Sequence, residues 1–76
     1  MAFYGILRHF RDEFPKYSEE DYRFISYVFV GFDATTLCII FNMPSVAAVY
    51  MKKSRIKKTI SDSNAKYRRN YLEMMV

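Results

Sequence analysis

The residue types that most often carry catalysis are sparse in this sequence. It contains one cysteine, Cys38, and one histidine, His9, and they belong to different predicted helices. A catalytic thiol needs a base within reach, whereas Cys38 is expected in the core, where a small residue lets two helices approach closely. The acidic run of Glu19, Glu20 and Asp21 fits an exposed helix start better than a catalytic pair of carboxylates. We therefore expect no enzyme activity, no small-molecule substrate, no metal site and no cofactor.

Basic residues, by contrast, gather in the second part of the chain. Residues 1–44 carry four basic and six acidic residues, a net charge of −2. Residues 45–76 carry eight basic and two acidic residues, a net charge of +6. Such asymmetry is typical of a protein that meets a polyanion on one side. Nucleic acid is the first expectation, and an anionic membrane surface is the second.

Residues 45–60 have the pattern of an amphipathic helix within this basic part. Pro44 and Ser45 suit a helix start, because proline has a fixed φ and the serine hydroxyl can cap. Four apolar residues share one narrow arc at 100° per residue: Val46, Val49, Ile56 and Ile60. Lys53 shares this arc, so its stem is expected to lie along the apolar surface. The opposite side is small and basic: Ala47, Met51, Ser54, Arg55 and Lys58. A large anionic partner could approach that side, although a solvated surface helix would show the same pattern.

Three helices are predicted before this segment. The first covers residues 3–14 and ends before Pro15, since the residue before a proline avoids the helical region. The second starts at a capping-box-like Ser18-x-x-Asp21 and ends before Gly31, which suits a left-handed closing residue. The third covers about residues 34–41, with Asp33 as its cap. The residues expected to face inward are Phe3, Ile6, Leu7, Phe10, Phe14, Tyr22, Ile25, Ser26, Phe29, Leu37, Cys38, Ile40 and Phe41.

The turns complete the predicted architecture. Residues 42–44 form a three-residue turn between two helices, the length that a helix-turn-helix uses. Turn and cap formers in residues 61–64 predict a last helix over about residues 64–75. Its apolar stripe contains Tyr67, Tyr71, Met74 and Met75, with Leu72 beside it. The expected fold class is all-α, a tetrahelical helix-turn-helix bundle with an extra N-terminal helix. We expect residues 1–14 to be an N-terminal helix or a linker stub, and residues 15–76 to be a helix-turn-helix DNA-binding domain.

Length and composition are consistent with one small domain in a reducing compartment. The 76 residues are near the size at which a single core is only just sufficient. One cysteine cannot form an internal disulfide, and no apolar run approaches the ~20 residues needed to span a bilayer. The first ten residues lack the pattern of a signal peptide. We expect a cytoplasmic protein.

The motifs in this register resemble a known family. Ser18-x-x-Asp21, Gly31, Leu37-Cys38-x-x-Phe41-Asn42-Met43, Val49 and Ile56 are similar to the LuxR/GerE-type helix-turn-helix domains of bacterial transcription regulators. The resemblance covers Phe14 to about Leu72. The segments Phe14–Tyr22 and Val49–Lys58 resemble one branch, in which the domain ends large regulators with tetratricopeptide repeats and a transmembrane helix. The resemblance implies a carboxy-terminal fragment that meets a membrane only through a parent chain.

The resemblance implies sequence-specific binding to double-stranded DNA, with residues 45–60 in the major groove. The implied base contacts are Tyr50, Met51, Ser54 and Arg55, and the implied phosphate contacts are Ser45, Lys52, Lys57 and Lys58. Two departures affect this assignment. Ala48, Val49 and Tyr50 stand where the family usually has Thr and then Val-Lys, and Thr36 replaces a frequent Glu.

The alternative function is a protein-interaction or dimerisation module that docks through an apolar helix face. Related domains often pair through the final helix. We expect the isolated chain to be monomeric or a weak homodimer, because its final helix can pack on its first. DNA binding should weaken steeply with salt, whereas apolar docking should not.

Overall fold

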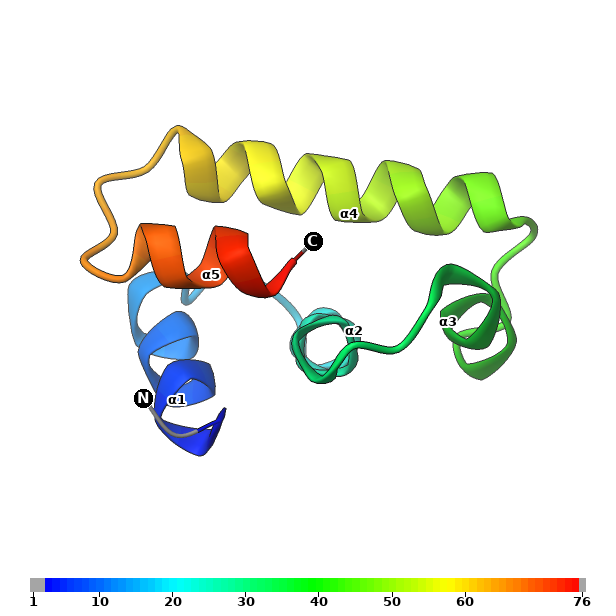
Figure 1. Ribbon diagram of the computed structural model, residues 1–76, viewed down its shortest axis with the longest axis horizontal. Helices are drawn as coiled ribbons and strands as arrows, with labels where there is room; N and C mark the ends of the chain where they lie inside the picture. The colour runs from blue at the N-terminus through cyan, green and yellow to red at the C-terminus, as the bar shows by residue number, and fades with distance from the viewer. Residues whose placement is uncertain (1–2, 76) are drawn as a thin grey trace.

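The computed structural model describes the backbone of residues 3–75 and the side chains of residues 5–75. This part of the chain forms five helices and no strand (Figure 1), so the predicted all-α fold class is confirmed. The helices are α1 (Phe3–Glu13), α2 (Glu19–Val30), α3 (Ala34–Ile40), α4 (Val46–Ser61) and α5 (Arg68–Met74). None of these helices is long and apolar enough to cross a membrane.

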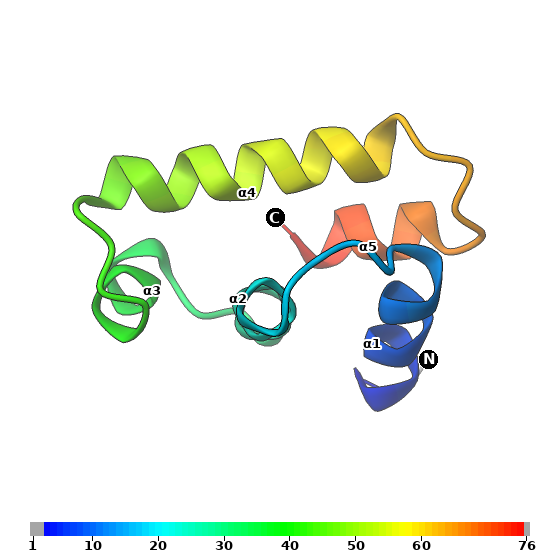
Figure 2. The same cartoon turned by 180° about the vertical axis from the view of Figure 1, so that it is seen from behind.

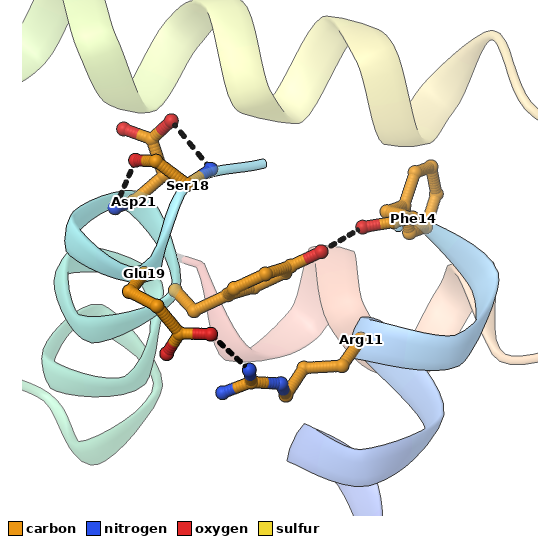
Figure 3. Close-up of polar contacts among 6 residues, drawn as sticks. Arg11, Phe14, Ser18, Glu19 and Asp21 are labelled. Carbon is orange, nitrogen blue, oxygen red and sulfur yellow. Dashed lines mark hydrogen bonds and ion pairs between the residues drawn. The ribbon is translucent and has the colours of Figure 1, made fainter. Parts of the chain in front are cut away.

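The local sequence sets both ends of α2, as predicted. The Ser18 hydroxyl accepts a hydrogen bond from the backbone N–H of Asp21, and the Asp21 carboxylate accepts one from the backbone N–H of Ser18 (Figure 3). At the other end Gly31 has a φ of 106°, and its N–H donates to the carbonyls of Tyr27 and Val28. A side chain at this position would be strained by the left-handed backbone, so glycine is the suitable residue.

Local caps also start α3 and α4. The Asp33 carboxylate accepts a hydrogen bond from the backbone N–H of Thr36 at 2.8 Å. The Ser45 hydroxyl accepts one from the backbone N–H of Ala48 at 3.2 Å. Pro44 differs from the prediction, because it lies one residue before the cap and not inside the first turn of α4.

The last helix starts later than predicted. α5 begins at Arg68, whereas the cap-forming residues had placed the start near Asn64. The hydroxyl of Ser63, two residues after the end of α4, donates to the carbonyl of Ile60 and accepts from the backbone N–H of Ala65. These residues therefore close α4 and form a turn, and no side-chain cap hydrogen bond starts α5.

The start of α5 has no local side-chain cap, and a hydrogen-bonded junction with α1 holds this region instead. The Glu13 carboxylate accepts from the Tyr71 hydroxyl at 2.6 Å and from the backbone N–H of Lys66 at 2.5 Å. Burial of Tyr71, together with the neighbouring Glu13 carboxylate, raises the pKa of Tyr71, so the hydroxyl keeps its proton and stays a donor. The junction therefore holds α1 against α5.

A second junction joins α1 to α2 (Figure 3). The hydroxyl of Tyr22 donates to the carbonyl of Phe14 at 2.5 Å. The guanidinium of Arg11 lies 4.5 Å from the centroid of the Tyr22 ring and forms an ion pair with Glu19. These contacts close the chain reversal between the two helices.

The helices pack around one core. α4 lies along one side of the molecule with α2 and α5 beneath it, α3 at one end and α1 at the other (Figures 1 and 2). α5 packs against α1, α2 and α4, and α3 packs against α4. Phe10 is central to the aromatic part of the core, with ring centroids 4.8 Å from Phe14 and 5.2 Å from Tyr71.

Most residues predicted to face inward are in the core. The buried ones are Ile6, Phe10, Phe14, Ile25, Phe29, Leu37, Val49, Ile56, Ile60, Tyr71 and Met75. The half-buried ones are Leu7, Tyr22, Ser26, Cys38, Phe41, Lys53, Tyr67, Leu72 and Met74. The predictions for Ile40 and Val46 were wrong, because these side chains are 44% and 37% exposed. The side chain of Phe3 lies outside the described residues. Phe24, Val28 and Ala34 are buried although the periodicity had not assigned them.

Candidate nucleic-acid interface

The outward side of α4 forms a ridge. Val49, Ile56 and Ile60 are buried against the other helices, so the side chains half a turn away from them face solvent. Four exposed residues, which we call the ridge, lie on that side: Ala47, Met51, Ser54 and Lys58. The side chains of Ala47 and Ser54 are short, so they cover little of the helix backbone at these positions. A partner could therefore come close to the helix backbone, as predicted from the sequence.

One flank of the ridge borders a hollow between α4 and the start of α2. The hollow has a volume of about 510 Å³ and is lined on α4 by Ala48, Met51, Lys52, Arg55, Ile56 and Thr59. Tyr17, Asp21 and Met43 line its opposite side. This flank contains two basic groups and one acidic group.

The other flank borders a smaller hollow between α4 and the end of α5. It has a volume of about 340 Å³ and is lined by Tyr50, Lys53, Ser54, Lys57 and Met75. Two ammonium groups and two hydroxyls thus share one concave surface, and no acidic residue lines it. The two ammonium groups suit an anion such as a phosphate, which accepts hydrogen bonds from them.

Lys53 was not among the predicted contacts. Its place on the apolar arc suggested a packing role, and the side chain is indeed half-buried. The missed signal was its i,i+4 spacing to Lys57, which sets two lysines side by side on a helix surface. The hollow that both residues line was not visible in the sequence, because Met75 of a distant segment forms part of it.

Lys52 is held differently from the other basic residues of α4. Its ammonium lies 2.8 Å from the Asp21 carboxylate and 4.9 Å from the centroid of the Phe24 ring. The hydrogen bond from Lys52, opposed by partial burial and reinforced by Ser18, lowers the pKa of Asp21. Lys52 would have to leave this pair to contact a phosphate fully.

The remaining predicted contact residues are open to solvent. Arg55, Lys57 and Lys58 are exposed, and within residues 5–75 none of them forms an ion pair. Tyr50 and Met51 are 59% and 56% exposed. Ser45 is exposed at the start of α4, where its hydroxyl caps the helix and can still donate a hydrogen bond.

The basic residues near α5 take part in the turn before that helix. Arg68 donates to the carbonyl of Ser63 at 2.8 Å, and the Lys66 ammonium lies 5.4 Å from the centroid of the Tyr67 ring. Arg69 is exposed. The positive charge of the second half of the chain therefore extends from α4 to this turn.

The residues with catalytic potential lie apart from one another. The Cys38 thiol donates to the carbonyl of Met43 at 3.3 Å in the turn between α3 and α4. The His9 ring packs on Tyr67, with ring centroids 4.3 Å apart, where α1 meets the turn before α5. In the part of the chain that the structure describes, no group of acidic, histidine and cysteine side chains could hold a metal ion.

Comparisons with protein-family models, curated proteins and solved structures find no match to this chain. The function is therefore inferred from its own residues.

Proposed function

We propose that this domain binds double-stranded DNA by placing α4 in the major groove. The observation that carries the proposal is the shape and charge of α4. Its ridge is uncovered, its two flanks are hollowed, and the hollow beside Tyr50, Lys53 and Lys57 contains no acid. A ridge of this kind suits base edges, and basic groups beside it suit the phosphates that border a groove.

Specific residues have distinct roles in this proposal. Tyr50, Met51, Ser54 and Arg55 face the bases. Ser45, Lys57 and Lys58 contact phosphates, and Lys53 is added to that group because it lines a hollow with Lys57. Lys52 contributes less, because Asp21 already neutralises it.

The same proposal includes a LuxR/GerE-type arrangement for α2 to α5. Its support is the order of caps and turns: a capping box at Ser18, a left-handed Gly31, a cap at Asp33, a short turn and a cap at Ser45. A parent transcription regulator in the bacterial cytoplasm follows only from that resemblance. Tyr71 of α5 and Met75 directly after it are buried within the single chain, which supports a monomeric or weakly dimeric isolated chain.

Salt-dependent binding tests the proposal directly. The affinity for a random-sequence 30-base-pair duplex pool is measured by fluorescence anisotropy at several salt concentrations. Each phosphate contact contributes about 0.9 to the slope of log affinity against log salt. The Lys57→Ala/Lys58→Ala variant should bind all duplexes more weakly, with a slope reduced by about 2.

A matched control removes the same charge elsewhere. Arg8 and Arg23 are exposed on α1 and α2, so the Arg8→Ala/Arg23→Ala variant has the same net charge as the Lys57/Lys58 variant. Its salt slope should equal that of the wild type. Equal slopes in the wild type and both variants would remove Lys57 and Lys58 from the interface, and the absence of salt-dependent binding would end the proposal.

A second candidate function, a protein-interaction module, is favoured by one observation. Ile39 in α3 is 75% exposed and Val30 at the end of α2 is 55% exposed, and exposed large aliphatic side chains can mark a protein-binding surface. Salt-insensitive binding of a protein partner, lost in an Ile39→Ser variant, would support this function.

A further inference from the structure

The start of α4 and its end differ in the groups that they present to a partner. Residues 34–51 contain no charged side chain, whereas residues 52–58 contain five basic ones. On the exposed part of α4 before Lys52, the large side chains are those of Val46, Tyr50 and Met51. The uncharged start lies next to the short turn from α3.

This difference limits how the start of α4 can recognise bases. Hydrogen-bonded readout in the major groove usually depends on Arg, Lys, Asn or Gln, which bind base edges in a bidentate manner. None of these residues lies between Val46 and Met51. The C5-methyl group of thymine is the feature of the groove that an apolar side chain can contact.

Exposure and position assign this contact to two residues. Met51 is on the ridge itself, and Tyr50 lies at its flank and lines the hollow there together with Lys53 and Lys57. The thioether of methionine is flexible and polarizable, so it adapts well to a methyl group. In a helix-turn-helix the first residues of the recognition helix contact base edges, which puts these side chains at the correct depth.

We propose that Met51 and Tyr50 select thymine through its C5-methyl group, so that the preferred binding site has thymine at the positions they face. The inference depends on the proposed insertion of α4 into the major groove. Lys53, Lys57 and Lys58 then supply affinity without sequence preference, because they contact phosphates.

Removal of the methyl group alone tests this assignment. Duplexes selected by the wild-type protein from a random pool are resynthesised with uracil in place of thymine, one position at a time. Uracil keeps the base pair and the O4 acceptor and lacks only the methyl group. Loss of one buried methyl contact should weaken binding about fourfold at each contacted position.

Two variants test whether the thymine preference comes from Tyr50 and Met51. In the Tyr50→Ala/Met51→Ala variant, thymine and uracil duplexes should bind equally well. In the Lys57→Ala/Lys58→Ala variant, both should bind more weakly while their ratio stays near fourfold. Tyr50 and Met51 are exposed, so the alanine variant should fold, which thermal melting verifies. If it does not fold, the single Met51→Ala variant takes its place.

The outcomes separate this inference from the function on which it depends. Salt-dependent binding that is insensitive to uracil at every position would overturn the thymine selection alone. An undiminished uracil effect in the Tyr50→Ala/Met51→Ala variant would overturn the assignment to these two residues. Absence of binding to any duplex would overturn both the inference and the proposed function.

Discussion

At the end of the molecule where α1 meets α5, large apolar side chains are enclosed, whereas at the end formed by α3 several of them face solvent, although Leu37 is buried. Phe10 is 1% exposed and packs among five other aromatic rings, while Phe32, just before α3, is 37% exposed and, among the side chains that the structure describes, stacks on Tyr27 alone. The two phenylalanines are chemically identical. The same residue type therefore fills the core at the first end and is partly open to solvent at the second, so we expect the first end to contribute more to stability.

The strongest test of this comparison makes the same substitution at both ends. Phe10→Ala should lower the free energy of unfolding by about 3–5 kcal/mol, because it leaves a cavity among packed rings. That cost is a large share of the stability of a small domain. Phe32→Ala should cost about 1 kcal/mol or less, the contribution of one exposed stacked pair. Urea denaturation of both variants gives the two values, and equal losses would mean that the ends do not differ.

A smaller effect is expected for the hydrogen bond between α1 and α5. Tyr71→Phe removes the hydroxyl that donates to Glu13, so a half-buried carboxylate oxygen loses its partner. The free energy of unfolding should fall by about 1–2 kcal/mol. Tyr67→Phe is the control, because the Tyr67 hydroxyl makes no hydrogen bond within residues 5–75, and it should change stability by less than about 0.5 kcal/mol. A loss in the control as large as that in Tyr71→Phe would exclude the Glu13 bond as the cause.

The smallest effect on stability concerns the ion pair between Asp21 and Lys52. The folded-state pKa of Asp21 is lowered, so its stabilising contribution is fully present above the unfolded-state value, near 3.8, and is lost as the pH falls through the folded-state pKa. Asp21→Asn should therefore cost up to about 1 kcal/mol at neutral pH. Its stability should also fall less than that of the wild type below pH 4, as measured by urea denaturation across the acid range.

The same substitution should raise the affinity for DNA although it lowers the stability of the fold. Asp21→Asn removes a negative charge beside α4 and frees Lys52, so affinity for duplex DNA should rise while stability falls. Asp33→Asn is the matched control, since it removes an equal charge at the α3 end and asparagine is also a good cap. Affinity that rises equally in both variants would indicate a general effect of net charge and not a role for Lys52.

Much of the fold could be predicted because its signals are local. Ser18, Gly31, Asp33 and Ser45 act on backbone groups a few residues away, and the structure confirms each of these caps. The start of α5 could not be predicted in this way. The carboxylate that binds the backbone near its start belongs to Glu13, 53 residues from Lys66 in the sequence.

The sequence also could not predict that apolar side chains near α3 are exposed. Ile40 and Val46 satisfy the helical spacing of an inner face, yet whether that face is covered depends on which helix packs there. The candidate site likewise has features that the sequence predicts and features that only the tertiary structure reveals. The exposed ridge followed from the periodicity of α4, whereas the pairing of Lys52 and the shared hollow of Lys53 and Lys57 needed the tertiary arrangement. The individual DNA contacts stay predictions.

The junction of Glu13 with Tyr71 has a consequence for the folding pathway. It joins residues 58 positions apart, and α5, with seven residues, is too short to persist as an isolated helix. α5 can be ordered in part by packing on the neighbouring α4, but its bond to Glu13 forms only after a long loop closes on α1, a step with an entropic cost. The local contacts of α3 with α4 need no such closure and can form earlier. We expect the α3–α4 unit to form first, and the closing of α1 on α5 to limit the folding rate.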